Sequence, residues 1–252
     1  RASTQRQNIA FCGYHGWHDW YLAANLKSKK NLNYHLLEGL KVGGVSNKLK
    51  DTIFPFKYND FKNLKKIITK NNIGIIKMEV VRDSTPKSNF LKKVRKLADE
   101  KKIILIFDEC TSGFRECLGG IHKKYNVEPD LLMLGKALGN GYPITAVLGV
   151  EKVMKSINKT FISSTFWTDS SGPTAALKTL EIMEKTKSWN YITKLGGYII
   201  KNWNKLSKKH NLKIQISGIN SLCKFNFMSN HNQKYKTFIT QEMLSKGILA
   251  TN

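Results

Sequence analysis

The sequence predicts an α/β fold in which a mostly parallel sheet is flanked by helices, and three observations support this prediction. Helical and strand-like segments alternate along the chain, as expected when parallel strands are joined by crossover helices. The strand-like segments are continuous apolar runs, which is typical of strands covered on both faces. With 252 residues, the chain is long enough for one large domain and part of a second.

The elements can be placed from their apolar patterns. Short apolar runs predict strands at 8–12, 73–81, 103–107 and 131–134. Apolar residues at helical spacing predict helices near 61–68 and 91–98. A third helix is expected over 175–185, because Pro173 follows Ser170 and Ser171 where a helix would begin, and a longer one spans about 189–210.

Both ends of the chain are expected to be cut from a longer protein. Arg1 stands where an initiator Met would be, and residues 1–7 resemble the end of a helix. The chain finishes with a strand-like segment, 247–250, that has nothing to pair with. We expect a large domain over 1–210, truncated at its N-terminus. Strands near 213–218 and 222–227 then predict the beginning of a smaller C-terminal α+β domain over 211–252.

The formal net charge of +24 raises the question of nucleic-acid binding. Only 5 of the 42 basic residues are Arg, the side chain that nucleic-acid readers favour for its bidentate geometry. The lysines are spread through helices and turns, and no nucleic-acid-binding motif accompanies them. A solvated, lysine-rich surface is therefore the preferred interpretation, with no nucleic-acid partner.

Cysteine usage and hydropathy indicate a cytoplasmic protein without a membrane partner. The four cysteines form no CxxC pair and no disulfide framework, which suits a reducing compartment. No apolar run approaches the roughly 20 residues of a membrane span.

Side chains able to do chemistry follow several of the predicted strands, at the edge where open α/β sheets bind ligands. Tyr14 follows the first strand, Asp108 and Glu109 follow the third, and Lys136 follows the fourth. Glu79 lies in the apolar run 73–81, directly after Met78, near which we expect the second strand to end. A lysine, a carboxylate and an aromatic ring at one edge are what pyridoxal phosphate (PLP) requires. Lysine forms an imine with the cofactor aldehyde, a reaction that needs a neutral amine and is favoured by desolvation.

The other residues have matching roles in this hypothesis. The carboxylate of Asp108 would keep the pyridine nitrogen protonated, and Tyr14 would stack on the ring. Gly135, without a side chain, would let the backbone approach the cofactor.

Two ordered motifs strengthen the hypothesis. The segment 107–115 reads Phe-Asp-Glu-Cys-Thr-Ser-Gly-Phe-Arg, and 134–143 reads Leu-Gly-Lys-Ala-Leu-Gly-Asn-Gly-Tyr-Pro. Together they resemble the signature of the class III aminotransferases, which depend on PLP. The turn Gly13-Tyr-His-Gly16 is similar to that of the glutamate-1-semialdehyde 2,1-aminomutase-like members. The resemblance covers almost the whole chain and implies the PLP-dependent transferase fold, as found in aspartate aminotransferase.

The resemblance also implies roles for single residues. Lys136 would be the Schiff-base lysine and proton shuttle, Asp108 would pair with the pyridine nitrogen, and Glu109 would brace that strand end. Cys110 stands where the family has a Val packed against the ring. In the family, a Thr of the neighbouring subunit binds the cofactor phosphate, which implies a homodimer with a shared active site. Counting back from Pro173 selects Thr168 for this role.

Matching the triplet Ser-Thr-Phe instead selects Thr165 for the phosphate, so this alternative stays open. The expected activity is transfer of an amino group on a small amino or oxo substrate, as in the aminomutases. A transaminase of another oxo-acid or a keto-sugar is the alternative. A non-catalytic, basic nucleic-acid-binding protein on the same fold is the alternative from a different class.

The sequence does not support three other kinds of site. Cys12, His15, His18 and Asp19 imitate a metal site, but no second cluster completes it. Gly135-Lys136 lacks the Ser or Thr that follows the lysine of a phosphate-binding loop. Cys117 and His122 could form a nucleophile pair, yet no third group is available to orient them. No metal is therefore expected.

Overall fold

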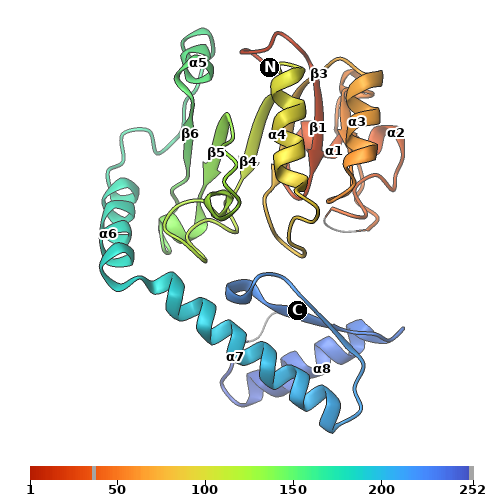
Figure 1. Cartoon of the computed structure of the whole chain (residues 1–252), viewed down its shortest axis with the longest axis vertical. Coiled ribbons are helices and arrows are strands. Elements are labelled where there is room, and N and C mark those ends of the chain that lie inside the picture. Colours follow the sequence, from red (N-terminus) through yellow and green to blue (C-terminus); the bar gives the residue numbers. More distant parts are fainter. Residues whose placement is uncertain (36–37, 250–252) are drawn as a thin grey trace.

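A computed structural model describes residues 1–35 and 38–249. Its centre is a six-stranded sheet with the order β2-β1-β3-β4-β5-β6 (Figure 1). The strands are β1 (Asn8–Cys12), β2 (Ile53–Pro55), β3 (Ile73–Glu79), β4 (Ile104–Asp108), β5 (Leu131–Leu134) and β6 (Ala146–Gly149). Neighbours are parallel except for β5 and β6, which are antiparallel. The predicted α/β fold with a mostly parallel sheet is confirmed.

Helices of very different length connect the strands. The α-helices are α1 (Asp19–Leu22), α2 (Ala24–Lys27), α3 (Phe61–Lys70), α4 (Phe90–Glu100), α5 (Glu151–Met154), α6 (Ser171–Thr186), α7 (Ser188–Lys209) and α8 (Asn232–Ser245). Short 3₁₀ helices lie at η1 (Asn47–Leu49), η2 (Ile121–Tyr125), η3 (Lys136–Leu138), η4 (Lys155–Lys159) and η5 (Asn220–Leu222).

One face of the sheet packs against α3 and α4. Asp60 begins α3 by accepting a hydrogen bond from the backbone N–H of Asn63 at 2.9 Å, which satisfies one of the free donors of the first turn. Leu64 and Ile68 then fall on one side of the helix and are buried, as are Val94 and Leu97 of α4. These side chains share a core with the alternate residues of β1, β3, β4 and β5.

The opposite face is covered mainly at β1, β2 and β3. Ile9, Phe11 and Ile75 pack there against the segment that carries α1 and α2, with Tyr21 fully buried among them. β3 is therefore buried along its whole length, whereas burial alternates along β4 and β5. We expected all these strands to be covered on both faces, which is wrong for β4 and β5. The α1–α2 segment covers this second face mainly at β1, β2 and β3.

The C-terminal part begins with the long helix α7, followed by a two-stranded antiparallel sheet of β7 (Ile214–Ser217) and β8 (Lys224–Phe227) and by α8 (Figure 1). α7 packs closely on this part. A Cβ at Gly196 would lie 1.8 Å from the backbone oxygen of Asn220, and the ring of Trp203 contacts Phe225 at 4.9 Å. The predicted boundary near residue 210 falls where α7 ends, and it stays a prediction.

Several expectations about the ends were wrong. Residues 2–4 form turns instead of the end of a helix. The strand expected over 247–250 is absent in its described part, since Gly247 lies in a turn and residues 248–249 are irregular, while Ala250 lies outside the described residues. The short strand β2 and the antiparallel strand β6 were not predicted.

Candidate active site

Parallel strands bring Glu79, Asp108 and Lys136 to one edge of the sheet. Glu79 ends β3 and Asp108 ends β4, and the two residues are paired in the register of these strands. Lys136 follows the neighbouring strand β5 by two residues. The backbone N–H of Glu109 donates to the carbonyl of Met133 at 2.9 Å, which ties the end of β4 to β5.

Asp108 is buried and held on both carboxylate oxygens. Its Oδ2 lies 3.0 Å from Nδ1 of His15 and 3.3 Å from Nζ of Lys77, while Oδ1 accepts from the N–H of Cys110 at 3.3 Å. Burial opposes ionisation, but the hydrogen bond from His15 and the charge of Lys77 outweigh it and hold the pKa of Asp108 below its usual value. Asp108 is therefore a carboxylate at neutral pH.

His15 and Lys77 are partners of Asp108 that sequence reasoning missed. His15 is buried, its Nε2 lies 3.1 Å from the carbonyl oxygen of Cys12, and its ring stacks on Trp20 at 6.2 Å. Burial lowers the pKa of His15, and the charge of Lys77 lowers it further, against the raising effect of Asp108. A single lysine inside the apolar run of β3 was the available signal for Lys77.

Lys136 does not share the partners of Asp108 and contacts Thr111. Its Nζ donates to Oγ1 of Thr111 at 2.9 Å, a contact that sequence reasoning also missed. Its backbone has φ of +45°, a left-handed conformation that non-glycine residues seldom adopt and that often marks functional positions. The side chain is exposed, so the expectation of a desolvated amine is wrong for this chain by itself.

Cys110, two residues after Asp108, packs against Gly135, the residue before Lys136. A Cβ on Gly135 would lie 3.1 Å from Cγ2 of Thr145 and 3.4 Å from Sγ of Cys110. The small size of Gly135 thus makes room for these two side chains, and the close approach of its backbone to a cofactor stays a prediction. Burial and the neighbouring Asp108 raise the pKa of Cys110 to about 11, so the thiol is uncharged at neutral pH.

Glu109 points away from this edge, into the loop that follows. It is fully buried and accepts from the backbone N–H groups of Ile121 and His122, the latter at 3.0 Å. It also lies 2.7 Å from Nδ1 of His122 and 3.4 Å from the hydroxyl of Ser112. These contacts fix the loop to the end of β4, which is the geometry of a bracing residue.

Tyr14 lies in a turn that is fixed by Glu79. Gly13 has φ of +107°, and a Cβ there would lie 2.5 Å from Oε2 of Glu79, so this turn requires glycine. Oε2 accepts from the N–H of Tyr14 at 3.0 Å and lies 3.4 Å from the guanidinium of Arg82. Arg82 also lies 5.9 Å from the centre of the Tyr14 ring. Burial raises the pKa of Glu79, and Arg82 opposes this rise.

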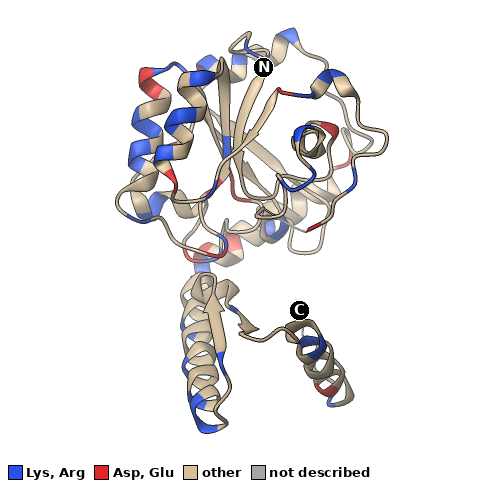
Figure 2. Cartoon of the chain, turned by 90° about the vertical axis from the view of Figure 1, so that its right-hand side faces the viewer, with Lys and Arg blue, Asp and Glu red and all other residues tan. Residues whose placement is uncertain are grey.

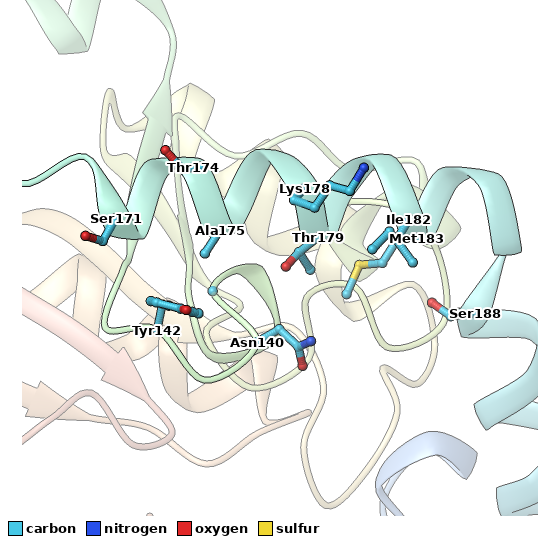
Figure 3. A pocket seen from close by; sticks show the side chains of 11 residues that line it. Asn140, Tyr142, Ser171, Thr174, Ala175, Lys178, Thr179, Ile182, Met183 and Ser188 are labelled. Atoms are coloured by element: carbon cyan, nitrogen blue, oxygen red, sulfur yellow. The ribbon is translucent and has the colours of Figure 1, made fainter.

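Besides a cavity of about 430 Å³ that Trp20 and Lys77 line in part, two more lie near the site. The smaller, of about 280 Å³, opens beside the turn at Gly13 and is lined in part by His35, Lys57, Glu79 and Arg82. The larger, of about 820 Å³, is an open groove between α6 and the loop after Lys136 (Figure 3). None of the residues expected to bind the cofactor lines the larger groove.

Thr165 and Thr168 lie on an exposed segment between η4 and α6. This segment also carries large apolar side chains that face solvent, with Phe161 95% and Trp167 68% exposed. Its backbone is shaped locally by Ser164 and by Asp169, which accepts from the N–H of Ser171 at 2.7 Å. The structure therefore favours neither Thr over the other.

The remaining alternatives concern metals, membranes and surface charge. Over the described residues, no three His, Cys, Asp or Glu side chains converge as a metal site would require. Within the same residues, no helix is both long and apolar enough to cross a membrane. Figure 2 shows basic residues over several helices and loops, in agreement with their spread along the sequence.

Comparisons with known proteins identify the family of the chain. The family model described as aminotransferase class-III matches residues 2–252. The chain is 34% identical to a 3-aminobutyryl-CoA aminotransferase of Cloacimonas acidaminovorans, over 96% of this chain and 56% of the relative. It is 31% identical to a glutamate-1-semialdehyde 2,1-aminomutase of Sulfurisphaera tokodaii, over 89% of this chain and 55% of the relative. The chain thus spans about half the length of these curated relatives.

Solved structures show the same fold at lower identity. The PLP form of the FumI protein of Sphingopyxis sp. MTA144 superposes with a TM-score of 0.86 at 22% identity, covering 100% of this chain and 59% of that one. An omega-transaminase from Sphaerobacter thermophilus superposes with a TM-score of 0.83 at 20% identity, covering 100% and 63%. On the family match over nearly its whole length, the chain belongs to the class III aminotransferases, whose cofactor is pyridoxal phosphate.

Proposed function

We propose that the protein is a PLP-dependent enzyme that transfers an amino group on a small amino or oxo substrate, with Lys136 as the residue that bonds the cofactor. One observation carries this proposal. Asp108, an ionised and buried carboxylate, and Lys136, a lysine in a left-handed turn, follow neighbouring parallel strands at the ligand-binding edge of the sheet.

The residues at this edge fit the chemistry of PLP. The amine of Lys136 contacts the hydroxyl of Thr111, a neutral group from which it can be released to react with an aldehyde. Asp108 retains its negative charge and can pair with a protonated pyridine nitrogen. Cys110 presents a small, uncharged side chain next to Gly135, and Tyr14 supplies an aromatic ring from the turn after β1.

Each residue has a defined task in this proposal. PLP, when bound, supplies an electron sink for the bond that breaks next to the substrate nitrogen. Asp108 holds the proton on the pyridine nitrogen, and Glu109 holds the loop that begins beside it. Nζ of Lys136, once free, takes a proton from the substrate carbon and returns it. Tyr14 limits the movement of the ring by stacking.

We also propose that the protein acts as a homodimer and that Thr168 of one subunit binds the cofactor phosphate of the other. Support comes from the exposed segment between η4 and α6, because Phe161 and Trp167 on it are apolar side chains that a second subunit would remove from water. Thr165 remains the alternative ligand. Such burial would at the same time desolvate the Lys136 amine if the two sites lie close to the interface.

The relatives support two reactions. The similarity to a 3-aminobutyryl-CoA aminotransferase supports a transaminase that uses two substrates, and the similarity to several aminomutases supports return of the amino group to the same skeleton. Arg82 and Lys57, which line the cavity beside Tyr14, provide positive charge for an acidic group on either substrate. A cytoplasmic location is proposed from the four free thiols.

The experiment is a spectroscopic and product assay on the intact protein. Purified protein should absorb visible light, and borohydride should remove this absorbance. With amino donor alone, a transaminase releases one equivalent of oxo product per site and then stops, whereas an aminomutase converts its substrate without an acceptor. A colourless protein that gains no absorbance from added PLP would contradict the proposed function.

A further inference from the structure

Asp108 forms a buried cluster with His15 and Lys77, two side chains that can each carry a positive charge. Lys77 extends from β3 on the same face as Glu79, and its Nζ lies 3.3 Å from Oδ2 of Asp108 with only 11% of its side chain exposed. The same oxygen lies 3.0 Å from Nδ1 of His15, whose side chain is fully buried. Two groups able to carry a proton therefore compete for one carboxylate oxygen.

The surroundings of His15 favour its doubly protonated form. Nδ1 faces the carboxylate of Asp108 and Nε2 faces the carbonyl oxygen of Cys12, and both of these are acceptors. Two influences resist the charged form, namely burial and the positive charge of Lys77. Lys77 is thus the positively charged neighbour that, in addition to burial, opposes a positive charge on His15.

The other groups packed around the cluster do not change this competition. The ring of Trp20 stacks on His15 and lies 5.4 Å from Nζ of Lys77, a position that favours the ammonium. Glu79 is paired with Arg82, and Cys110 contributes a backbone N–H to Oδ1 of Asp108. Burial, with a smaller effect of nearby His15, lowers the pKa of His35 to about 4, so it is neutral above that pH.

We propose that Lys77 is a positioning residue for Asp108: its ammonium supplies the positive charge that holds the carboxylate ionised and in place, and this leaves His15 uncharged. The role of Asp108 toward a pyridine nitrogen rests on the proposed function, but the coupling of Lys77 to His15 does not. A lysine ordinarily keeps its charge through the neutral pH range, whereas a histidine does not. With Lys77 as the charged partner, the ionisation and the ion pair of Asp108 do not change between about pH 5 and 9.

The test measures the protonation of His15 directly, in the intact protein freed of PLP. The ¹³Cε1 and ¹Hε1 signals of His15 are assigned by their loss in His15→Gln and followed by NMR from pH 5 to 9. In the wild type we expect His15 to become protonated at a lower pH than an ordinary histidine does. In Lys77→Met its pKa should rise by about one unit or more, a tenfold or greater gain in proton affinity.

Rescue and control variants separate this effect from a structural one. Lys77→Arg restores the fixed charge and should return the titration to that of the wild type. Lys62→Met, on the exposed side of α3, should leave it unchanged. If Lys77→Met does not fold, Lys77→Gln removes the charge with a polar side chain of similar reach and should give the same shift. An unchanged His15 titration in folded Lys77→Met or Lys77→Gln would overturn the proposal.

A second readout on the PLP-loaded protein distinguishes the two proposals. The pH profile of kcat/KM in Lys77→Met should gain an inflection at the pH where its His15 titrates, and Lys77→Arg should lack it. Without cofactor-dependent absorbance in the wild type, the proposed function fails, while a shifted His15 titration still supports the role of Lys77. With normal absorbance and an unshifted titration, only the role of Lys77 fails.

Discussion

The region around Asp108 and the segment around Thr168 differ in burial and in the number of contacts that their side chains make within this chain. Asp108 has two buried partners from other parts of the chain, His15 and Lys77, and also accepts from the backbone N–H of Cys110. Thr165 and Thr168 lie among exposed residues that include Phe161 and Trp167. The fold of a single chain positions the Asp108 half, whereas in the proposed homodimer the Thr168 half would be completed by the partner subunit.

The difference teaches where mutations should act locally and where they should act between subunits. A buried carboxylate with charged partners is costly to disturb, because the remaining charges stay behind in the core. An exposed threonine can be changed without effect on the fold of its own chain. Lys136 lies between these extremes, since its backbone is constrained while its side chain is exposed.

The largest effect is expected for Lys136→Ala. Loss of the amine removes both the bond to the cofactor and the proton transfer, the second of which alone is worth up to about 10⁴-fold in rate. Turnover should be abolished while the melting temperature stays close to that of the wild type, because the side chain is exposed. Lys152→Ala is the matched control and should retain activity. Residual turnover of Lys136→Ala above 1% would show that another group does this chemistry.

The next effect is expected for Asp108→Asn, which tests the buried half of the site. We expect a loss of about 10²- to 10³-fold in kcat, since a fixed charge aimed at the cofactor is removed. Unfolding by urea should also show a loss of about 3 kcal/mol, because Lys77 is left without its carboxylate. A variant with normal stability and normal amino transfer would mean that Asp108 neither pairs with the cofactor nor anchors the cluster.

Acid should lower the free energy of unfolding of the wild type, and it should lower that of Asp108→Asn less. The pKa of Asp108 is lowered by folding, so its stabilisation is present above the pKa of the unfolded chain, about 3.9, and is lost as the pH falls below it. The difference in unfolding free energy between the two proteins should therefore shrink from pH 5 to pH 3. A difference that stays constant over this range would contradict the charge on Asp108.

A smaller effect is expected for Thr168→Ala, which tests the exposed half. Loss of one hydrogen bond to a phosphate should weaken PLP binding by about 10- to 100-fold, with an unchanged melting temperature of the cofactor-free protein. Mixing this variant with Lys136→Ala should restore activity, because a hybrid dimer has one site with both residues intact. Thr165→Ala is the control. Complementation by Thr165→Ala and not by Thr168→Ala would assign the phosphate to Thr165.

The smallest effect concerns His35, whose Nδ1 accepts from the N–H of Gly13 at 3.2 Å. Burial lowers its pKa to about 4, so between about pH 6.5 and 4 the unfolded chain binds a proton that the folded chain does not. Stability should fall with decreasing pH in this window by at most about 1.4 kcal/mol per pH unit. His35→Asn keeps an acceptor and should show a shallower slope in pH-dependent unfolding. Equal slopes would show that His35 is not the group responsible.

The parallel strands, and the place of Asp108 and Lys136 at the ends of two neighbouring strands, could be predicted from short-range patterns of apolar runs and motifs, while the roles of these two residues stay predictions. It did not reveal His15, Lys77 or Thr111 as partners, since these contacts depend on the register between strands and on side chains far apart in the chain. The charge inside the apolar run of β3 was a visible signal whose partner only the fold identifies.

The edge strand β6 was not predicted from the sequence. β6 pairs antiparallel to β5, and its residues are largely exposed, so an apolar pattern alone could not separate it from the neighbouring loop. The phosphate ligand was also left open between Thr165 and Thr168, and a single chain cannot decide it because the expected contact lies in another subunit.

The most direct test of the central claim is to locate the cofactor on the chain. The intact protein is loaded with PLP, reduced with borohydride, digested and mapped by mass spectrometry. We predict that the pyridoxyl group is found on the peptide containing Lys136, in nearly all of the protein, and that it is absent from Lys136→Ala. Finding it instead on Lys77, Lys123 or Lys152, or finding no modified lysine, would contradict the assignment of the active site.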